Sequence, residues 1–252
     1  MNRIRDSGYE IFQPYGRNCV LNAAEFGVPQ MRKRVIIVGH RKDLDFGESF
    51  YHRLYKEKAS KSLYTVRDAI LDLPALRCGE GSDRWYGPYD KEAHSEYARQ
   101  MRQNSPGVLN HKARAHNEAD QARYRYFIEH SLMGKKANIH TLMNDAPELM
   151  PKHKNAKTFL DRFKVQAWNY PSCTITSHLS RDGNYYIHPD PAQCRSFTVR
   201  EAARCQSFPD NYLFEGPRTA QFKQVGSAVP PILSYCIADT IAKMIKTNIN
   251  KS

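Results

Sequence analysis

The 252-residue sequence has no long apolar run. Its longest aliphatic stretch is residues 35–38, whereas a membrane-spanning helix needs ~20 apolar residues. The first ten residues, MNRIRDSGYE, lack the apolar core of a secretory signal peptide. The six cysteines form no C-x-x-C pair, which argues against a zinc ribbon or a disulfide scaffold. We therefore expect a cytoplasmic globular protein with reduced thiols, no metal site and no membrane segment.

The charge of the chain is strongly positive. It carries 38 lysines and arginines against 26 aspartates and glutamates, a net charge of +12. Between residues 97 and 165 lie 13 basic and 6 acidic side chains, so the middle of the chain holds over half of the excess. Such a chain suits a polyanionic partner, most often nucleic acid, although a basic composition alone is also compatible with a merely soluble protein.

Strand patterns occur near both ends of the chain. The β-branched run at residues 34–38 predicts a strand that is buried on both faces, as in the middle of an α/β sheet. Residues 174–176 and 185–187 predict a hairpin around the Asp-Gly turn at 182–183. Residues 76–116 show no sustained period and predict long loops.

Helix starts are marked by capping residues. Thr65 and Thr198 each open a capping-box pattern, with Asp68 and Glu201 at the third helical position. Asn117 is a third candidate cap, for a helix that ends at Gly134. A last helix is predicted over residues 230–246, with an apolar face wide enough to need a large partner surface.

Three stretches carry longer motifs. Residues 26–39 read FGVPQMRKRVIIVG, residues 195–210 read RSFTVREAARCQSFPD, and residues 224–231 read QVGSAVPP. The first matches G-x-P-Q-x-R-x-R, and the second matches R-x-x-T-x-R-E-x-A-R-x-Q-x-F-P. The third matches Q-x-G-N-A-V-P-P except that serine replaces asparagine. Their common order and spacing argue against chance agreement.

These motifs together resemble the C-terminal part of cytosine-C5 DNA methyltransferases. The resemblance implies an α/β fold, in which two strands and a C-terminal helix of the Rossmann-like S-adenosylmethionine domain flank an irregular α+β target-recognition domain. We expect residues 1–45 to belong to the catalytic domain, residues 46–215 to form the recognition domain, and residues 216–252 to return to the catalytic domain. The implied reaction is transfer of a methyl group from S-adenosyl-L-methionine to cytosine C5 in a specific sequence of double-stranded DNA.

Several parts of the family pattern are missing from this sequence. The family's nucleophile is the cysteine of a Pro-Cys dipeptide, and no cysteine here follows a proline. The Glu-Asn-Val segment and the F-x-G-x-G cofactor loop are also absent. We therefore expect a recognition subunit or segment that is inactive alone. Its partner would be a catalytic subunit carrying the F-x-G-x-G, Pro-Cys-Gln and Glu-Asn-Val motifs.

The strand motif supplies candidate residues for catalysis. Arg32 and Arg34 alternate with Lys33, which predicts that the two arginines share one face of the strand. Planar guanidinium groups suit a phosphate or a base carbonyl. By resemblance they lie beside the target cytosine, with Arg34 nearest its O2 and Arg32 also contacting DNA. Gln30 would order that face or touch DNA. From spacing alone, a solvated strand edge is the competing interpretation.

The third motif supplies the candidate cofactor site. Gly226, Ser227, Ala228 and Val229 resemble the segment that lines the S-adenosylmethionine pocket in the family. Ser227 stands where the family has asparagine and keeps one hydroxyl on a shorter side chain. A glycine turn before a helix is the alternative interpretation of this segment.

DNA contacts are expected in the basic middle of the chain. Phosphate contacts fix the register of a protein on DNA, and a few base-edge contacts set the sequence. The candidate phosphate ligands are Lys135, Lys136, Lys152, Lys154 and Lys157. Two rival hypotheses remain: a non-catalytic DNA-binding remnant of such an enzyme, and an interaction scaffold that never touches DNA.

Overall fold

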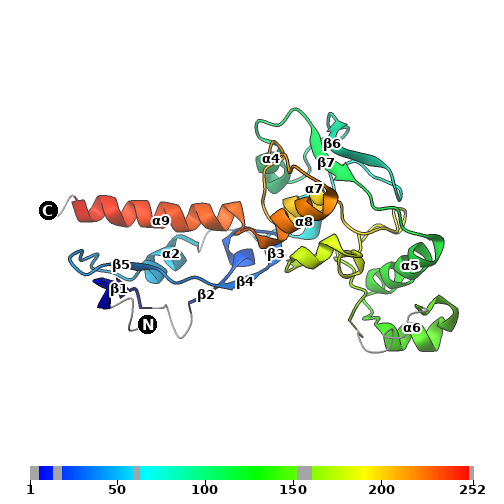
Figure 1. The fold of residues 1–252 in the computed structure, drawn as a ribbon, viewed down its shortest axis with the longest axis horizontal. Helices are drawn as coiled ribbons and strands as arrows, with labels where there is room; N and C mark the ends of the chain where they lie inside the picture. Colours follow the sequence, from blue (N-terminus) through cyan, green and yellow to red (C-terminus); the bar gives the residue numbers. More distant parts are fainter. Residues whose placement is uncertain (1–5, 14–18, 59–62, 152–160, 250–252) are drawn as a thin grey trace.

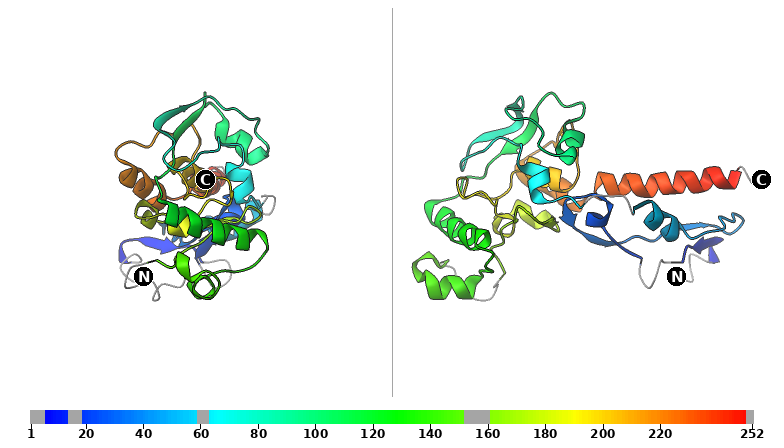
Figure 2. Two further views of the ribbon diagram at one scale, coloured as in Figure 1. Left: turned by 90° about the vertical axis from the view of Figure 1, so that its right-hand side faces the viewer. Right: turned by 180° about the vertical axis from the view of Figure 1, so that it is seen from behind.

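The computed structural model of the chain describes residues 6–13, 19–58, 63–151 and 161–249. The molecule is elongated and has two lobes (Figure 1). The narrow lobe is formed by the described part of residues 6–58 together with 231–249, so both ends of the chain lie in it. The broad lobe is formed by the described part of residues 63–230. Figure 2 shows the broad lobe end-on and the long C-terminal helix pointing away from it.

The narrow lobe is built from short strands and two helices. Its elements are β1 (Tyr9–Ile11), β2 (Val20–Asn22), η1 (Ala23–Phe26), β3 (Gln30–Met31), β4 (Lys33–Val35), β5 (Gly39–Arg41), α2 (Phe50–Lys58) and α9 (Pro231–Ile249). β1 pairs antiparallel with β5, and β2 pairs antiparallel with β4 so that Leu21 lies opposite Arg34. Helices α2 and α9 pack on one side of these strands, and the core between them contains Phe26, Phe50, Leu54, Leu233 and Met244.

The run at residues 34–38 is not buried on both faces, contrary to the sequence prediction. Ile36 and Val38 pack against the narrow-lobe core. Val35 and Ile37, which point the other way, are 64% and 53% exposed. The described residues supply a layer of helices on one side of these strands only, which leaves the opposite apolar face uncovered.

The broad lobe mixes short helices with irregular segments. In chain order its elements are α3 (Val66–Ile70), β6 (Gly81–Gly87), α4 (Glu96–Arg102), β7 (Val108–Lys112), α5 (Glu118–Leu132), α6 (Ile139–Asp145), η2 (Pro147–Leu149), β8 (Ser172–Cys173), η3 (Ser177–Ser180), η4 (Asn184–Tyr186), α7 (Val199–Cys205) and α8 (Arg218–Ser227). β6 pairs antiparallel with β7. β8 pairs in parallel with β3, which joins the two lobes.

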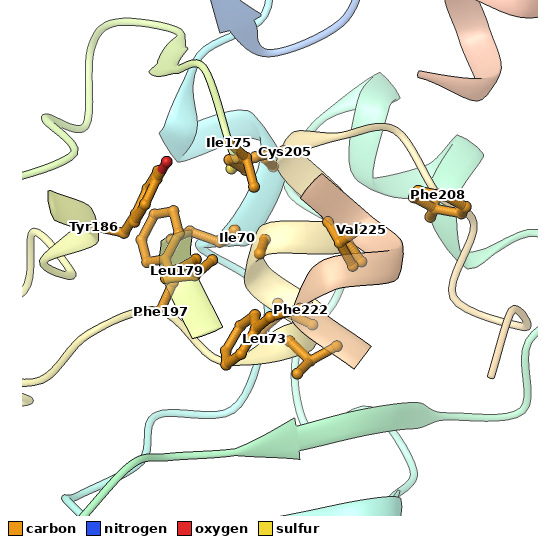
Figure 3. Close-up of a cluster of buried hydrophobic side chains, with 14 of the residues drawn as sticks. Ile70, Leu73, Ile175, Leu179, Tyr186, Phe197, Cys205, Phe208, Phe222 and Val225 are labelled. Atoms are coloured by element: carbon orange, nitrogen blue, oxygen red, sulfur yellow. The ribbon is translucent and has the colours of Figure 1, made fainter. Parts of the chain in front are cut away.

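A central apolar cluster holds the broad lobe together. Ile70 and Leu73 meet Phe197, Phe222 and other side chains from α7, α8 and the segments around them (Figure 3). A smaller cluster, containing Tyr124, Phe127, Ile139 and Phe163, packs α5 and α6 onto this lobe. The broad lobe therefore has its own closed core.

All three predicted helix starts are confirmed. The side chain of Thr198 accepts from the Glu201 amide at 3.2 Å, and Glu201 accepts from the Thr198 amide at 2.7 Å. Thr65 forms the same reciprocal box with Asp68. Asn117 accepts from the amide of the third helical residue of α5 at 2.8 Å. These caps are local interactions, and for that reason the sequence pattern was sufficient to predict them.

Other local predictions were wrong. Residues 174–187 do not form a hairpin: Gly183 adopts φ +78° at the expected turn, but the 3-10 helix η3 lies between the two predicted arms and the 3-10 helix η4 overlaps the second arm. Ile187 instead bridges Val165 and Ser196, which lie outside the hairpin. Residues 76–116 contain β6, α4 and β7 rather than loops alone, because long-range packing orders segments of weak local propensity.

The packing also divides the chain differently from the predicted boundaries. Helix α2, at Phe50–Lys58, contributes to the narrow-lobe core although residue 45 was the expected end of that part. Helix α8, at Arg218–Ser227, contributes Phe222 and Val225 to the broad-lobe core although it lies after residue 215.

One helical stretch in the described residues, Arg218–Thr247, is long and apolar enough to cross a membrane by length and composition alone. It comprises α8 and α9 with a non-helical break at 228–230. The search for an aliphatic run missed it because alanines, serines and a cysteine separate its apolar side chains. Core helices meet the same criterion, and Leu233 and Met244 of this stretch are buried in the narrow-lobe core.

Candidate functional site

Gln30 lies at the junction of the two lobes. Its side chain is fully buried. Its Nε2 donates to the Cys205 carbonyl at 3.1 Å and to the side chain of Gln206. Its Oε1 accepts from the Ile175 amide at 3.0 Å. The amide group therefore ties β3 to α7 and to the segment after β8, which fits the expected ordering role.

Arg32 is buried just after Gln30, and among the described residues its side chain donates to main-chain carbonyls alone, with no partner for its Nε. Its Nη1 donates to the Ile175 carbonyl at 2.7 Å. Its Nη2 donates to the carbonyls of Gly226 at 3.1 Å and Ala228 at 3.0 Å. Burial, and then the nearby charge of Arg34, lower the pKa of Arg32 to about 10, so the guanidinium stays charged at neutral pH.

This placement differs from the prediction that Arg32 contacts DNA. Only 3% of the residue is exposed, and in this structure its donors point at carbonyls rather than at a groove. The strand breaks between β3 and β4 at this residue, so the alternation that was expected to put Arg32 and Arg34 on one face does not hold.

Arg34 remains available for a substrate. It lies on β4 and is partly exposed. Among the described residues, its side chain has one hydrogen-bond partner, the Lys33 carbonyl at 2.7 Å. Guanidinium donors that no carboxylate occupies can still bind a base carbonyl or a phosphate.

The predicted cofactor segment, residues 226–229, contacts Arg32 through the carbonyls of Gly226 and Ala228. Gly226 is buried and ends α8 against residues 176–177. Ser227 is exposed, and its hydroxyl donates to the Lys223 carbonyl at 2.7 Å, which leaves its acceptor lone pairs free. Val229 is 48% exposed. A hydroxyl and an apolar side chain are thus exposed where the sequence predicts the cofactor wall.

A basic groove crosses the broad lobe next to β3. It consists of two adjoining hollows of about 1110 and 440 Å³ that share Asp161, Lys164 and Tyr185. Five lysines and arginines line the two hollows against two aspartates: Lys135, Lys136, Arg162, Lys164 and Arg181 against Asp161 and Asp182. The groove therefore has the charge that a nucleic-acid backbone requires.

The wall of the groove nearest the narrow lobe is polar. Thr174, Thr176 and His178 line it beside Met31 of β3. The Lys164 ammonium lies 5.3 Å from the centre of the Tyr185 ring, which holds it at the groove surface. Hydroxyl, imidazole and phenol groups at such a wall can contact phosphates or base edges.

The predicted lysines divide into two groups. Lys135 and Lys136 are exposed and line the smaller hollow, where a phosphate could reach them. Lys152, Lys154 and Lys157 lie outside the described residues. Sequence reasoning missed Lys164 and Arg181, because only the folded chain brings them to the same groove as Lys135.

The arginines of the second motif have structural positions. Arg195 makes a bidentate pair with Glu201, at 2.8 and 2.7 Å. Arg204 bridges Asp72 and Asp210 at 3.1 and 2.6 Å. Arg200 donates to three main-chain carbonyls. All three are fully buried, so this motif organises the broad lobe and does not face a ligand.

Four of the six cysteines have a thiol that is harder to ionise than a free cysteine thiol. Burial raises the pKa of Cys78, Cys173, Cys194 and Cys205. A nucleophilic cysteine requires the opposite shift, toward the thiolate. Within the described ranges, no three His, Cys, Asp or Glu side chains lie together as metal ligands.

Comparisons with known proteins agree with this arrangement. The chain is 47% identical over 234 residues to the type II methyltransferase M.Bpa9945I of Bacillus paralicheniformis, covering 91% of this chain and 51% of that protein. It is 31% identical to the type II methyltransferase M.DdeI of Desulfomicrobium norvegicum, covering 92% and 55%. The chain thus spans about half the length of these relatives.

A solved structure shares the fold. A crystal structure of a chain named as a DNA modification methyltransferase, encoded within an E. coli prophage, superimposes with a TM-score of 0.64 at 19% identity. The match covers 96% of this chain and 62% of that chain. The family model for C-5 cytosine-specific DNA methylases matches residues 1–243. On this evidence the chain belongs to the C-5 cytosine-specific DNA methylase family.

Proposed function

We propose that this chain is the DNA-recognition portion of a DNA (cytosine-5-)-methyltransferase that acts on a specific sequence of double-stranded DNA. The observation that carries the proposal is that the basic groove, residues 226–229 and Arg34 all lie close to Arg32 at the junction of the two lobes. Arg32 donates to the carbonyl of Ile175, whose two neighbours line the basic groove, and also to two carbonyls of the segment at residues 226–229. Arg34 is partly exposed and close enough for its charge to act on Arg32.

The chemistry assigns a limited role to these residues. Methylation at C5 needs a thiolate that adds to cytosine C6, and no cysteine of this sequence follows a proline as the family's nucleophile does. S-adenosylmethionine supplies the methyl group when it is bound. Arg34 would hold the O2 of the target cytosine, and Ser227 and Val229 would form part of the cofactor wall. The nucleophile, its acid and the F-x-G-x-G cofactor loop come from residues outside these 252.

The exposed apolar face of the narrow lobe supports this division. Val35 and Ile37 lie exposed on one side of the strands, and Tyr235 and Ile245 lie exposed on α9. Large apolar side chains exposed on both sides of a lobe are typical of a surface that another part of the protein covers. We propose that the catalytic portion, with the F-x-G-x-G, Pro-Cys-Gln and Glu-Asn-Val motifs, covers it and completes the sheet.

The names of the relatives extend the proposal to its setting. M.Bpa9945I and M.DdeI are type II methyltransferases, and such enzymes accompany restriction nucleases. We propose that this chain acts in a restriction-modification system and works in the cytoplasm, bound to DNA.

Reconstitution tests the proposal. The chain, the catalytic portion and an equimolar mixture are each incubated with unmethylated genomic DNA and tritiated S-adenosylmethionine. We expect tritium in DNA from the mixture only, and loss of at least 10-fold in the rate with Arg34→Ala, because that group is expected to touch the base. Methylation by the chain alone would refute the need for an external nucleophile.

The same experiment separates the alternative function. The substitution of serine for asparagine at position 227 is the one motif change that favours a remnant without catalysis. A remnant binds DNA in a salt-dependent manner and supports no methyl transfer with any catalytic portion. If the wild-type mixture transfers no methyl group and the mixture with Ser227→Asn does, the result would favour the non-catalytic remnant.

A further inference from the structure

The side chain of Arg32 holds both the wall of the basic groove, at residues 174–178, and the cofactor segment, at residues 226–229. The Ile175 peptide is held from both ends: its amide donates to Gln30 at 3.0 Å, and its carbonyl accepts from Arg32 at 2.7 Å. Its side chain is buried in the broad-lobe core (Figure 3). The neighbours Thr174 and Thr176 line the groove.

The other half of the Arg32 guanidinium holds the cofactor segment. It donates to the carbonyls of Gly226 and Ala228 at 3.1 and 3.0 Å. The side chain of Gln206, itself bonded to Gln30, donates to the same Ala228 carbonyl at 2.8 Å. Residues 226–229 and residues 174–176 thus share one planar cation as their common partner.

Main-chain packing brings the two segments into direct contact. A Cβ atom added at Gly226 would lie 2.4 Å from the Thr176 carbonyl carbon and 2.5 Å from the Ser177 amide nitrogen. No side chain fits between the end of α8 and this wall. A displacement of either segment therefore has to move the other or break its bonds to Arg32.

Arg32 differs from the other buried arginines in its partners. Arg195 and Arg204 are each paired with carboxylates. Arg200 also donates to three main-chain carbonyls, but it lies 3.7 Å from the carboxylate of Asp210. No carboxylate among the described residues pairs with Arg32. A buried cation without an anion is expensive, and an apolar side chain of similar volume would stabilise the same space better. An arginine at this place makes physical sense where three carbonyls on two segments must be held in one plane.

We propose that Arg32 is a positioning residue that couples cofactor binding to DNA binding. DNA in the groove restrains residues 174–178, and through the guanidinium it restrains the carbonyls of residues 226 and 228. The cofactor then meets a segment that is already ordered and loses less conformational freedom on binding. By linkage, the cofactor tightens DNA binding by the same factor. The inference rests on the proposed function, since it assigns DNA to the groove and the cofactor to residues 226–229.

A binding experiment on the complete methyltransferase tests the coupling. The Kd of S-adenosylhomocysteine is measured by titration calorimetry, alone and with saturating sheared unmethylated genomic DNA. We expect DNA to lower this Kd by at least 5-fold in the wild type, a typical size for coupled sites. Arg32→Met should bring the ratio of the two Kd values close to 1. Arg32→Lys, which keeps one charged donor group, should restore part of it.

The controls separate positioning from folding. Arg84→Met removes an exposed arginine of the broad lobe that pairs with Glu215 and makes no contact with Arg32. It should leave the ratio of the two Kd values unchanged. Near-ultraviolet circular dichroism checks that each variant is folded. If Arg32→Met does not fold, Gly226→Ala replaces it, since the added methyl group pushes the two segments apart.

Each outcome decides one question. A wild-type ratio of 1, or a folded Arg32→Met or Gly226→Ala protein with the full ratio, would overturn the coupling and leave the proposed function intact. A complete enzyme that binds neither S-adenosylhomocysteine nor DNA would instead overturn the proposed function.

Discussion

The two lobes differ in how completely they bury their own apolar surface. The broad lobe encloses Phe197, Phe222 and their neighbours on all sides. The narrow lobe has a core under α2 and α9 but leaves Val35 and Ile37 exposed on the other face of the same strands. A closed core indicates a unit that can fold by itself, whereas a one-sided layer indicates part of a larger domain. The narrow lobe is therefore the part of the chain against which we propose that the catalytic portion packs.

The broad lobe also buries charge, and the narrow lobe does not to the same degree. Arg195, Arg200, Arg204, Glu201 and Asp210 are all at most 1% exposed. Burial favours their neutral forms, but the partners hold the pKa of Glu201 and Asp210 below the ordinary range of carboxyl groups. Such networks stabilise little over an apolar core, yet they are damaging to break.

The largest expected effect is therefore loss of one member of that network. Arg204→Met leaves the carboxylates of Asp72 and Asp210 buried without their shared cation. We expect the free energy of unfolding of the broad lobe to fall by about 3–5 kcal/mol. Urea titration followed by tryptophan fluorescence measures it, because both tryptophans lie in this lobe.

The matched control is an exposed pair on the same lobe. Arg84 and Glu215 are bonded at 3.0 Å, and their side chains are 69% and 62% exposed. Arg84→Met should change the free energy of unfolding by less than about 1 kcal/mol. Equal losses in both variants would mean that burial does not distinguish the two pairs.

Acid should destabilise the same lobe. Burial lowers the pKa of His111 from 6.5 to about 4. Its Nε2 lies 2.8 Å from the Pro74 carbonyl, and its Nδ1 lies 3.0 Å from the Thr198 hydroxyl, so the neutral ring satisfies both. The unfolded chain takes up a proton below pH 6.5 and the folded chain does not. Stability is thus complete above pH 6.5 and is lost as the pH falls toward 4, by about 2 kcal/mol at pH 5 for this residue.

The measurement compares urea unfolding at pH 7.5 and pH 5. Glu201 adds little to the difference in unfolding free energy between these two pH values. Its carboxyl has a pKa of 4.5 in the unfolded chain and a lower pKa in the folded chain, so the stability that it contributes is lost only as the pH falls below 4.5. His111→Gln should remove about 2 kcal/mol of the difference between the two pH values. His178→Gln, at an exposed position of the groove, should leave the difference as in the wild type. If His111→Gln loses as much unfolding free energy between pH 7.5 and pH 5 as the wild type does, other groups cause the loss.

The sequence predicted those features that depend on near neighbours. The caps at Thr65, Asn117 and Thr198 join residues three positions apart, and all three are confirmed. The motifs at residues 26–39, 195–210 and 224–231 resemble those of the family that the comparisons show. Local spacing carries this information directly.

The features that failed depend on distant partners. The expected common face of Arg32 and Arg34 fails because the acceptors of Arg32 lie 143 to 196 positions further along the chain. The expected hairpin fails because Ile187 pairs with Val165 and Ser196. Alternation along a strand cannot reveal a break that tertiary contacts impose.

Removing the exposed face of the narrow lobe should affect association rather than folding. Val35→Glu combined with Ile37→Glu places two charges on a surface that is already in water in the isolated chain. We expect the isolated wild-type chain to self-associate through this face. The double variant should weaken that association by about 2 kcal/mol, or roughly 30-fold in Kd. Sedimentation velocity measures it.

An equally exposed apolar pair on the broad lobe is the control. Leu132 and Met133 are 57% and 67% exposed at the end of α5. Leu132→Glu combined with Met133→Glu should leave self-association unchanged, because the partner surface is proposed for the narrow lobe only. A dilute wild-type chain that sediments as a monomer would count against the proposal itself.

The smallest expected effect tests whether a lysine of the broad lobe and a lysine of the narrow lobe contribute differently to DNA binding. Lys164 is exposed in the groove, held near the Tyr185 ring, whereas Lys246 is exposed at the last turns of α9 in the narrow lobe. Each contact between a lysine and a phosphate releases a counterion, so the slope of log K against log salt concentration reports the number of contacts. Lys164→Gln should reduce this slope by about 1 and weaken binding alike across DNA sequences. Lys246→Gln removes the same charge from the chain and should leave the slope unchanged. Equal changes in both variants would mean that DNA responds to the net charge of +12 rather than to the groove, and the division of labour between the lobes would then not extend to DNA binding.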